Sequence, residues 1–174
     1  MRKRKLGVVA LTAITLATLP IMSATTAEAL EPPLAFTSND LSTWQTDGVV
    51  WALAEHEGTV FAGGTFSHIR PPGSPDGSNE QSAANFAAFD AATGAPTSCK
   101  LSFTIGSGTA TVRALNVSPD GETLYAGGYF SAVNGMPASS LVAIDIDTCT
   151  PITSFRPAVS ATVRAIQSTD DPVY

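Results

Sequence analysis

Short apolar runs separated by polar turns recur along the chain, in an order that is written twice and begun a third time. Residues 49–54 and 59–62 are the first pair of runs, and residues 111–117 and 122–126 repeat them. Residues 163–166 then restart the pattern. Runs of this length, rich in β-branched and aromatic residues and bounded by turn residues, predict β-strands. Beyond the N-terminal segment the chain shows no sustained helical periodicity, so it is expected to be all-β.

Each repeat continues with two more predicted strands. The third strands are residues 84–90 and 141–145, and each ends in an aspartate that opens a turn. The fourth strands are residues 100–105 and, with weaker alternation, residues 152–155. We therefore expect repeated four-stranded antiparallel units, which bury their apolar faces only against one another.

A glycine pair follows the second predicted strand of each unit, Gly63-Gly64 in the first and Gly127-Gly128 in the second. Glycine permits a positive φ, and it also lets the backbone pass very close to a neighbouring element. We expect these four repeat glycines to end the strands where the inner edges of packed sheets crowd together. A phosphate-binding loop is the other interpretation, but that loop ends in Gly-Lys-Ser/Thr and opens a helix, and neither feature is present here.

The repeats divide the chain into units at residues 49–109, 110–160 and 161–174, the last of them truncated. The first unit is longer because it carries a Pro- and Gly-rich insertion, residues 68–82, where the second has residues 132–140. Polar insertions of this kind belong to surface loops. Units of about 50 residues with four short strands match the blades of a β-propeller, so we expect a partial β-propeller of about two and a half blades.

The pattern Val-x-Ala-Leu, hydrophobic-Ala-Gly-Gly-x-Phe-Ser and Phe/Ile-Asp resembles the delta-60-type repeats of secreted bacterial β-propeller proteins. The resemblance covers residues 49–174, and it brings no shared catalytic motif that maps onto this chain. Propellers close with roughly four to eight blades. We therefore expect the chain to be the N-terminal fragment of a longer one, whose remaining blades are its partners. A short protein that self-associates to complete a ring is the alternative.

The N-terminus has the three parts of a secretory signal peptide. Basic residues at positions 2–5 precede an apolar stretch at residues 6–19, and Ala27-Glu28-Ala29 supplies the small residues that a signal peptidase needs. A membrane anchor is disfavoured, because this stretch is too short to cross a hydrocarbon core of about 30 Å. We expect residues 1–29 to form a signal-peptide helix cleaved after Ala29, residues 30–48 to be a lead-in segment, and the protein to be secreted and extracellular.

The charge balance bears on the class of partner. The whole chain has a formal net charge of −6, and removal of the signal peptide leaves five basic and 14 acidic residues, a net charge of −9. Such a surface repels the phosphates of nucleic acids and anionic lipid headgroups. We therefore expect no nucleic-acid partner and no membrane association after cleavage.

The chain has two cysteines, Cys99 and Cys149, which lie 50 residues apart, close to one repeat length. In an exported protein this pair is a candidate structural disulfide, with free thiols as the alternative. A cross-link across such a loop contributes about 4 kcal/mol in the loop-entropy account. A catalytic thiol would need a base, and the chain's two histidines, His56 and His68, are both far away in sequence.

The remaining titratable residues suggest metal sites that each have a simpler structural interpretation. Asp145 and Asp147 would share one face of an extended strand and could ligate Ca²⁺, but an aspartate at this point also opens an Asx turn. His56, His68 and Glu80 could form a metal site, yet their spacing matches no local ligand motif. We predict no catalytic residue, no metal site, no cofactor-binding residue and no cofactor.

Trp51 is the candidate ligand contact, because it occupies the slot held by Arg113 and Arg164 in the other units. That slot is expected on the less buried face, where Trp51, together with Trp44, would offer a sugar-stacking platform. Packing between units is the alternative use of a large aromatic side chain.

Two functions are compatible with these features. The first is a secreted non-enzymatic β-propeller repeat module that binds a protein or a glycan. The alternative is the N-terminal part of an extracellular propeller enzyme, an oxidoreductase or a glycan-acting one, with its active site downstream of residue 174. The absence of a catalytic constellation in the sequence favours the first.

Overall fold

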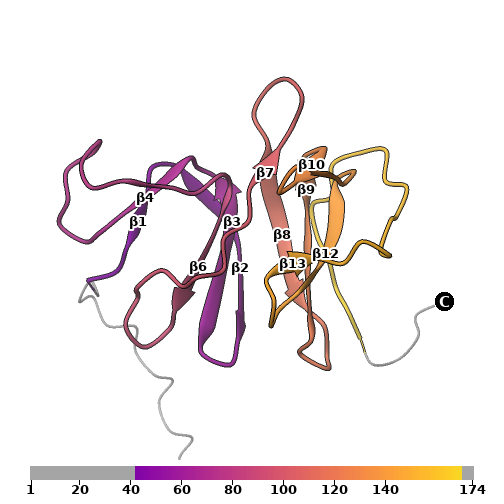
Figure 1. The fold of residues 1–174 in the computed structure, drawn as a ribbon, viewed down its shortest axis with the longest axis horizontal. Helices are drawn as coiled ribbons and strands as arrows, with labels where there is room; N and C mark the ends of the chain where they lie inside the picture. Colours follow the sequence, from indigo (N-terminus) through magenta and orange to yellow (C-terminus); the bar gives the residue numbers. More distant parts are fainter. Residues whose placement is uncertain (1–41, 170–174) are drawn as a thin grey trace, which may run out of the picture. The chain divides into compact units, whose positions relative to one another are not determined.

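The computed structural model describes residues 42–169, in which strands and turns alternate and no helix occurs. The expectation of an all-β chain is confirmed for this part: the strands form four small antiparallel sheets (Figure 1). No helix in residues 42–169 is long and apolar enough to cross a membrane. The predicted signal-peptide helix, residues 1–29, lies outside the described residues, as do residues 30–41 of the lead-in segment.

The first of the two larger sheets is built from β2 (Val49–His56), β3 (Thr59–Thr65) and β6 (Phe86–Asp90), in the order β2-β3-β6. Both pairings are antiparallel. Beyond β6, an isolated antiparallel bridge between Phe89 and Pro96 stands where a fourth strand would lie.

The second larger sheet repeats this plan in the next part of the chain. It consists of β8 (Thr111–Val117), β9 (Thr123–Tyr129), β12 (Leu141–Asp145) and β13 (Thr150–Pro151), in the order β13-β12-β9-β8. β8 and β12 have the bounds that the sequence predicts. β8 contacts both β2 and β3, so the two sheets pack against each other (Figure 1).

The predicted fourth strands are wrong. In residues 100–105, Phe103–Thr104 forms β7, which joins the small sheet β11-β10-β7 with β10 (Ala132–Val133) and β11 (Met136–Pro137). In the second unit the fourth strand is β13, which ends just before the predicted residues 152–155. The physical reason is the tightness of the turn after each third strand, which brings the chain back to the sheet within a few residues.

The long insertion of the first unit is not only a loop. It begins with β4 (His68–Arg70) and ends with β5 (Gln81–Ser82), which form a small sheet with β1 (Gln45–Thr46) in the order β1-β4-β5. β4 corresponds to β10 of the second unit, since each strand begins directly after a Phe-Ser dipeptide, Phe66-Ser67 or Phe130-Ser131. The small sheets are thus a second repeated element, which the sequence pattern does not predict.

Aromatic side chains fill the space between the two larger sheets. The rings of Phe61, Phe86, Phe103 and Phe130 form a continuous series, with centroids 6.2, 5.9 and 4.9 Å apart. All four are at most 2% exposed. Phe103 lies on β7, in the connection between the units, so this core belongs to both units at once.

The repeat glycines occupy equivalent environments in the two units. β3 and β9 run through the glycine pairs instead of ending there. A Cβ atom on Gly63 would lie 3.0 Å from Val112 Cβ, and one on Gly127 would lie 2.9 Å from Val163 Cβ. Neither glycine has a positive φ. Glycine is therefore needed here because a neighbouring side chain approaches the backbone closely. In each case that side chain is the first valine of the next unit.

Candidate functional site

The edge strands of the larger sheets share an irregularity that redirects one side chain in each. β2 has a bulge at Trp51, and β8 has a bulge at the matching residue, Arg113. A bulge adds one residue to a strand and takes its side chain out of the regular alternation. The bulges place these two side chains together, across the junction of the units.

The two bulged side chains are tied to each other and to two threonines. The Arg113 guanidinium carbon lies 4.8 Å from the centre of the Trp51 ring, a cation–π arrangement. Trp51 Nε1 donates to Thr65 Oγ1 at 2.9 Å, and Thr65 Oγ1 donates to Thr111 Oγ1 at 3.1 Å. The indole is therefore fixed both at its N–H and over one face of its ring.

Two of the aromatic side chains in this region face solvent. Trp51 and Tyr129 are each 49% exposed. Tyr129 holds in the second unit the position that Thr65 holds in the first, and it lies opposite Thr111 in the register. We call Trp51, Thr65, Thr111, Arg113 and Tyr129 the rim cluster. It offers aromatic surface, hydroxyl groups and a cation, and the contacts above hold Trp51, Thr65, Thr111 and Arg113 in place.

The two tryptophans have different surroundings. Trp51 packs on the next unit through Arg113, and about half of its surface remains in solvent. Trp44 is half-buried and packs against a small cluster that contains Phe66 and Ile69. Trp44 is therefore an anchor for the β1-β4-β5 sheet.

His68 lies between two carboxylates at the start of the insertion. Its Nδ1 is 3.1 Å from Asp47 Oδ2 and 3.8 Å from Glu80 Oε2. Asp47 Oδ1 also accepts the backbone N–H groups of Ser67 and His68, at 2.7 and 2.9 Å. Because both carboxylates approach the same ring nitrogen, the arrangement ties β1 to β4 and to the insertion.

The structure brings together only part of the metal-site candidate. His68 and Glu80 are neighbours, but His56 lies against the turn of the second unit, where a Cβ on Gly121 would be 2.8 Å from its Nε2. Within residues 42–169 no group of three or more His, Cys, Asp or Glu side chains could hold a metal ion.

The environment of Asp47 predicts a contribution to acid stability. Burial raises its pKa, but the backbone N–H groups of His68 and Ser67, with the His68 ring, outweigh this and lower the pKa below its usual value. A carboxylate with a lowered folded-state pKa stabilises the fold above its unfolded-state pKa of about 3.9, and this stabilisation is lost as the pH falls through the folded-state value.

We therefore expect Asp47→Asn to lower the free energy of unfolding at pH 7 by roughly 1 kcal/mol, because it weakens charge-assisted hydrogen bonds. The difference from the wild type should shrink as the pH is lowered below about 4. Urea unfolding at several pH values measures both effects. The matched control is Asp147→Asn, at an exposed aspartate away from this cluster; a difference between wild type and Asp47→Asn that is independent of pH would contradict the assignment.

Asp145 is used by a turn, as its counterpart Asp90 is. Asp145 Oδ1 accepts the N–H of Thr148 at 2.8 Å and its hydroxyl at 2.6 Å, and Asp90 Oδ1 accepts the same two groups of Thr93 at 2.7 Å each. The side-chain and backbone hydrogen bonds from these threonines lower the pKa of both aspartates. The Asx-turn interpretation therefore accounts for Asp145, while Asp147 is exposed.

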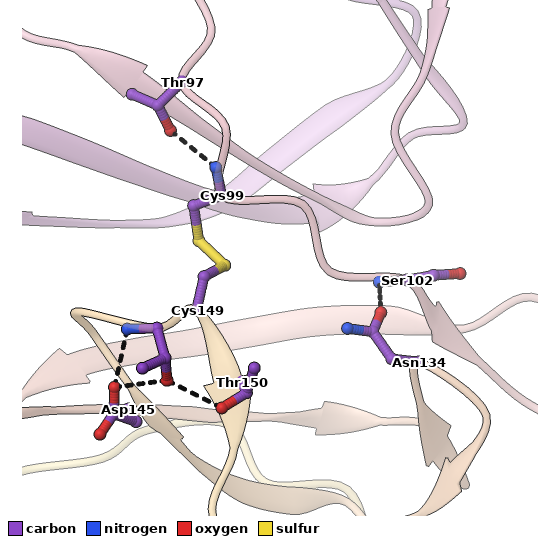
Figure 2. Close-up of a disulfide and its surroundings, with 8 residues drawn as sticks. Thr97, Cys99, Ser102, Asn134, Asp145, Cys149 and Thr150 are labelled. Atoms are coloured by element: carbon purple, nitrogen blue, oxygen red, sulfur yellow. Dashed lines mark hydrogen bonds between the residues drawn. A yellow bond between two sulfur atoms is a disulfide. The ribbon is translucent and has the colours of Figure 1, made fainter.

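A disulfide joins the connection between the units to this second turn. Cys99 and Cys149 are bonded through their sulfur atoms, as Figure 2 shows. Their Cα atoms are 5.4 Å apart. Nearby, Asn134 Oδ1 accepts the backbone N–H of Ser102 at 2.8 Å. The connection is thus fixed to the second unit by one covalent bond and by hydrogen bonds.

Sequence reasoning missed Thr65, Thr111, Tyr129 and Asp47, and it named Arg113 only as the counterpart of Trp51. The two threonines belong to the site because the bulges bring Trp51 and Arg113 together at the junction of the units. The bulges themselves cannot be recognised in the sequence, because no particular residue type marks them. Asp47 lies in the segment predicted as a lead-in, which offers no apolar periodicity to interpret.

Comparison with known proteins adds no relative to this description. No protein-family model matches the chain, and no curated protein and no solved structure matches it. The functional assignment therefore rests on the geometry of the described residues.

Proposed function

We propose that the chain is a secreted, non-enzymatic repeat module of β-propeller type, similar to delta-60 repeats, that binds a ligand through the rim cluster. The observation that carries the proposal is the half-exposed Trp51 ring, held by the next unit and by Thr65. In this proposal residues 1–29 are removed after Ala29, no cofactor is involved, and the units at 49–109 and 110–160 are blades.

Of the two ligand classes, protein or glycan, the rim cluster favours a glycan. A fixed indole face accepts the C–H face of a sugar ring, and its immobility reduces the entropy lost on binding. The hydroxyl of Tyr129 and the guanidinium of Arg113 are donors for sugar hydroxyls. A mature chain with a net charge of −9 repels polyanions, so the preferred ligand is a neutral polysaccharide.

The test is a calorimetric titration of the secreted chain with soluble neutral polysaccharides, a β-glucan, a galactomannan and a xylan, because calorimetry gives an affinity for variants with or without Trp51; tryptophan fluorescence of Trp44→Phe is the second readout. Trp44→Phe leaves Trp51 as the reporter, since the chain has two tryptophans. We expect Trp51→Ala to weaken binding at least about tenfold, which corresponds to about 1.4 kcal/mol, while Trp44→Phe binds as the wild type does.

Two results would count against the proposal. The first is the absence of binding to every polysaccharide of the panel. The second is equal affinity of the wild type and Trp51→Ala, which would place the ligand elsewhere. If the chain instead binds a protein, and Trp51→Ala weakens that binding, the rim cluster is the binding site but its ligand is a protein and not a glycan.

The partners that we propose for the sheets themselves are further units of the same kind. They are either remaining blades of a longer chain or units of another copy. The support is the first sheet, whose outer face carries exposed Val50 and Leu53.

A further inference from the structure

One face of the first larger sheet is apolar and uncovered. It consists of the exposed Val50 and Leu53, the half-buried Val60 and Phe89, and the buried Ala62 between them, and we call it the open face. Leu53 is 65% exposed and Val50 is 38% exposed. With residues of the β1 segment the open face lines a groove of about 620 Å³. Large exposed apolar patches in soluble proteins mark sites of interaction.

The second sheet shows what covers such a face. Its corresponding residues are at most 9% exposed; they are Val112, Leu115, Leu124, Ala126 and Ile144. The first unit covers them, and Gly63 provides the space for the side chains of Val112 and Leu115. The surface that can pack against the open face is therefore a sheet face that carries a glycine at the position equivalent to Gly63.

The described chain contains a second glycine face of this kind, around Gly127. It is covered by Val163 and Ile166, whose side chains lie where a Cβ of Gly127 would be. These residues belong to the segment 161–169, which forms no strand. The segment is held by a hydrogen bond from Val163 N to Gly128 O at 3.1 Å and by contacts of Ser168 with Asn116. A segment without a strand thus covers Gly127, whereas a complete sheet covers Gly63.

The segment and the open face present the same pattern to a glycine face. Val163-Arg164-Ala165-Ile166 repeats Val50-Trp51-Ala52-Leu53. The first and fourth residues of this pattern are the ones that fill the space over the glycine. A β2 strand from another molecule can therefore replace the segment with like contacts, and it brings a whole sheet face with it.

We infer that the open face of one copy of this chain docks on the Gly127 face of a second copy, where it replaces the segment 161–169. The contact is head-to-tail, because the two surfaces differ, so repetition produces a chain of molecules or a closed ring. This self-association does not depend on glycan binding, and a different variant tests it.

The first experiment is sedimentation velocity of the full secreted chain over a range of concentrations. We expect wild-type protein to associate as the concentration rises and Leu53→Asp to remain monomeric, because a carboxylate cannot enter the apolar contact. Leu53 is exposed, so this variant is expected to fold, which its thermal melt verifies. The control Ser107→Asp adds the same charge on an exposed loop, outside both faces, and should associate as the wild type does.

The second experiment releases the competing segment. Val163→Asp combined with Ile166→Asp removes the apolar contacts of the segment with Gly127, and we expect self-association to become at least tenfold stronger. Wild type and this double variant both remaining monomeric would overturn the inference, and so would unchanged association of Leu53→Asp.

The third experiment identifies the two surfaces. Gly127→Val blocks the glycine face and leaves the open face intact, whereas Leu53→Asp does the reverse. Each variant alone should be monomeric, and an equimolar mixture should form a one-to-one dimer that grows no further. A mixture that stays monomeric, or one that forms larger species, would contradict the head-to-tail contact.

Discussion

Removal of the Cys99–Cys149 disulfide is expected to lower the free energy of unfolding by about 4 kcal/mol. The bond closes a loop of 50 residues, which contains all the strands of the second unit except β13. In the unfolded chain the cross-link removes many conformations, so its loss mainly stabilises the unfolded state. For a domain of this size that is a large share of the usual 5–15 kcal/mol.

Urea unfolding of the wild type and of Cys99→Ser/Cys149→Ser measures the effect. Cys149 has a φ of +52°, and the corresponding residue of the first unit is Gly94, with a φ of +68°. A second variant, Cys99→Ser/Cys149→Gly, therefore removes the cross-link and relieves the turn. It should be more stable than the double serine variant, by up to about 1 kcal/mol. Equal stability of oxidised wild type and the double serine variant would contradict the expected role of the bond.

Replacement of Gly63 by valine is expected to destabilise the fold by about 3 kcal/mol, at the upper end of the usual cost of overpacking. The new Cβ would lie 3.0 Å from Val112 Cβ and 3.3 Å from Leu115 Cδ1. Val112 is fully buried and stiff at χ1, so the two sheets would have to separate. The measurement is the urea midpoint of the variant against that of the wild type.

Gly106→Val is the matched control, because a Cβ there meets no atom within 4 Å and the residue does not have a positive φ. Its stability should stay within about 0.5 kcal/mol of the wild type. Val112→Ala should relieve part of the clash, so the double variant Gly63→Val/Val112→Ala should be more stable than the sum of the single effects. Additive effects would show that the clash is not with Val112.

Much of the secondary structure can be read from the residue pattern. β8 and β12 have the predicted bounds because alternation, β-branched residues and a tight turn agree at their ends. For the repeat glycines the sequence allows either a positive φ or a close approach, and at Gly63 and Gly127 the structure has the close approach. The sequence pattern shows that the glycines repeat, but it does not show which residue packs against them. Only the packed side chain of Val112 decides between the two reasons for glycine at Gly63.

The small strands could not be predicted in the same way. β1, β5 and β11 have two residues each, too few to display an alternation. They form because pairing in a small sheet provides hydrogen-bond partners for the backbone N–H and C=O groups of segments that leave a larger sheet. The rim cluster was predicted only as far as Trp51, since its other members depend on how the bulges of two different units meet.

The disulfide also has a mechanical consequence. When the protein is pulled along its backbone, tension that reaches Cys99 passes through the sulfur–sulfur bond to Cys149. The strands β8, β9 and β12 lie outside that path and carry no tension. About 170 Å of extended chain is thereby withheld from stretching until the bond is reduced, so the redox state of the surroundings sets how far this region can be drawn out.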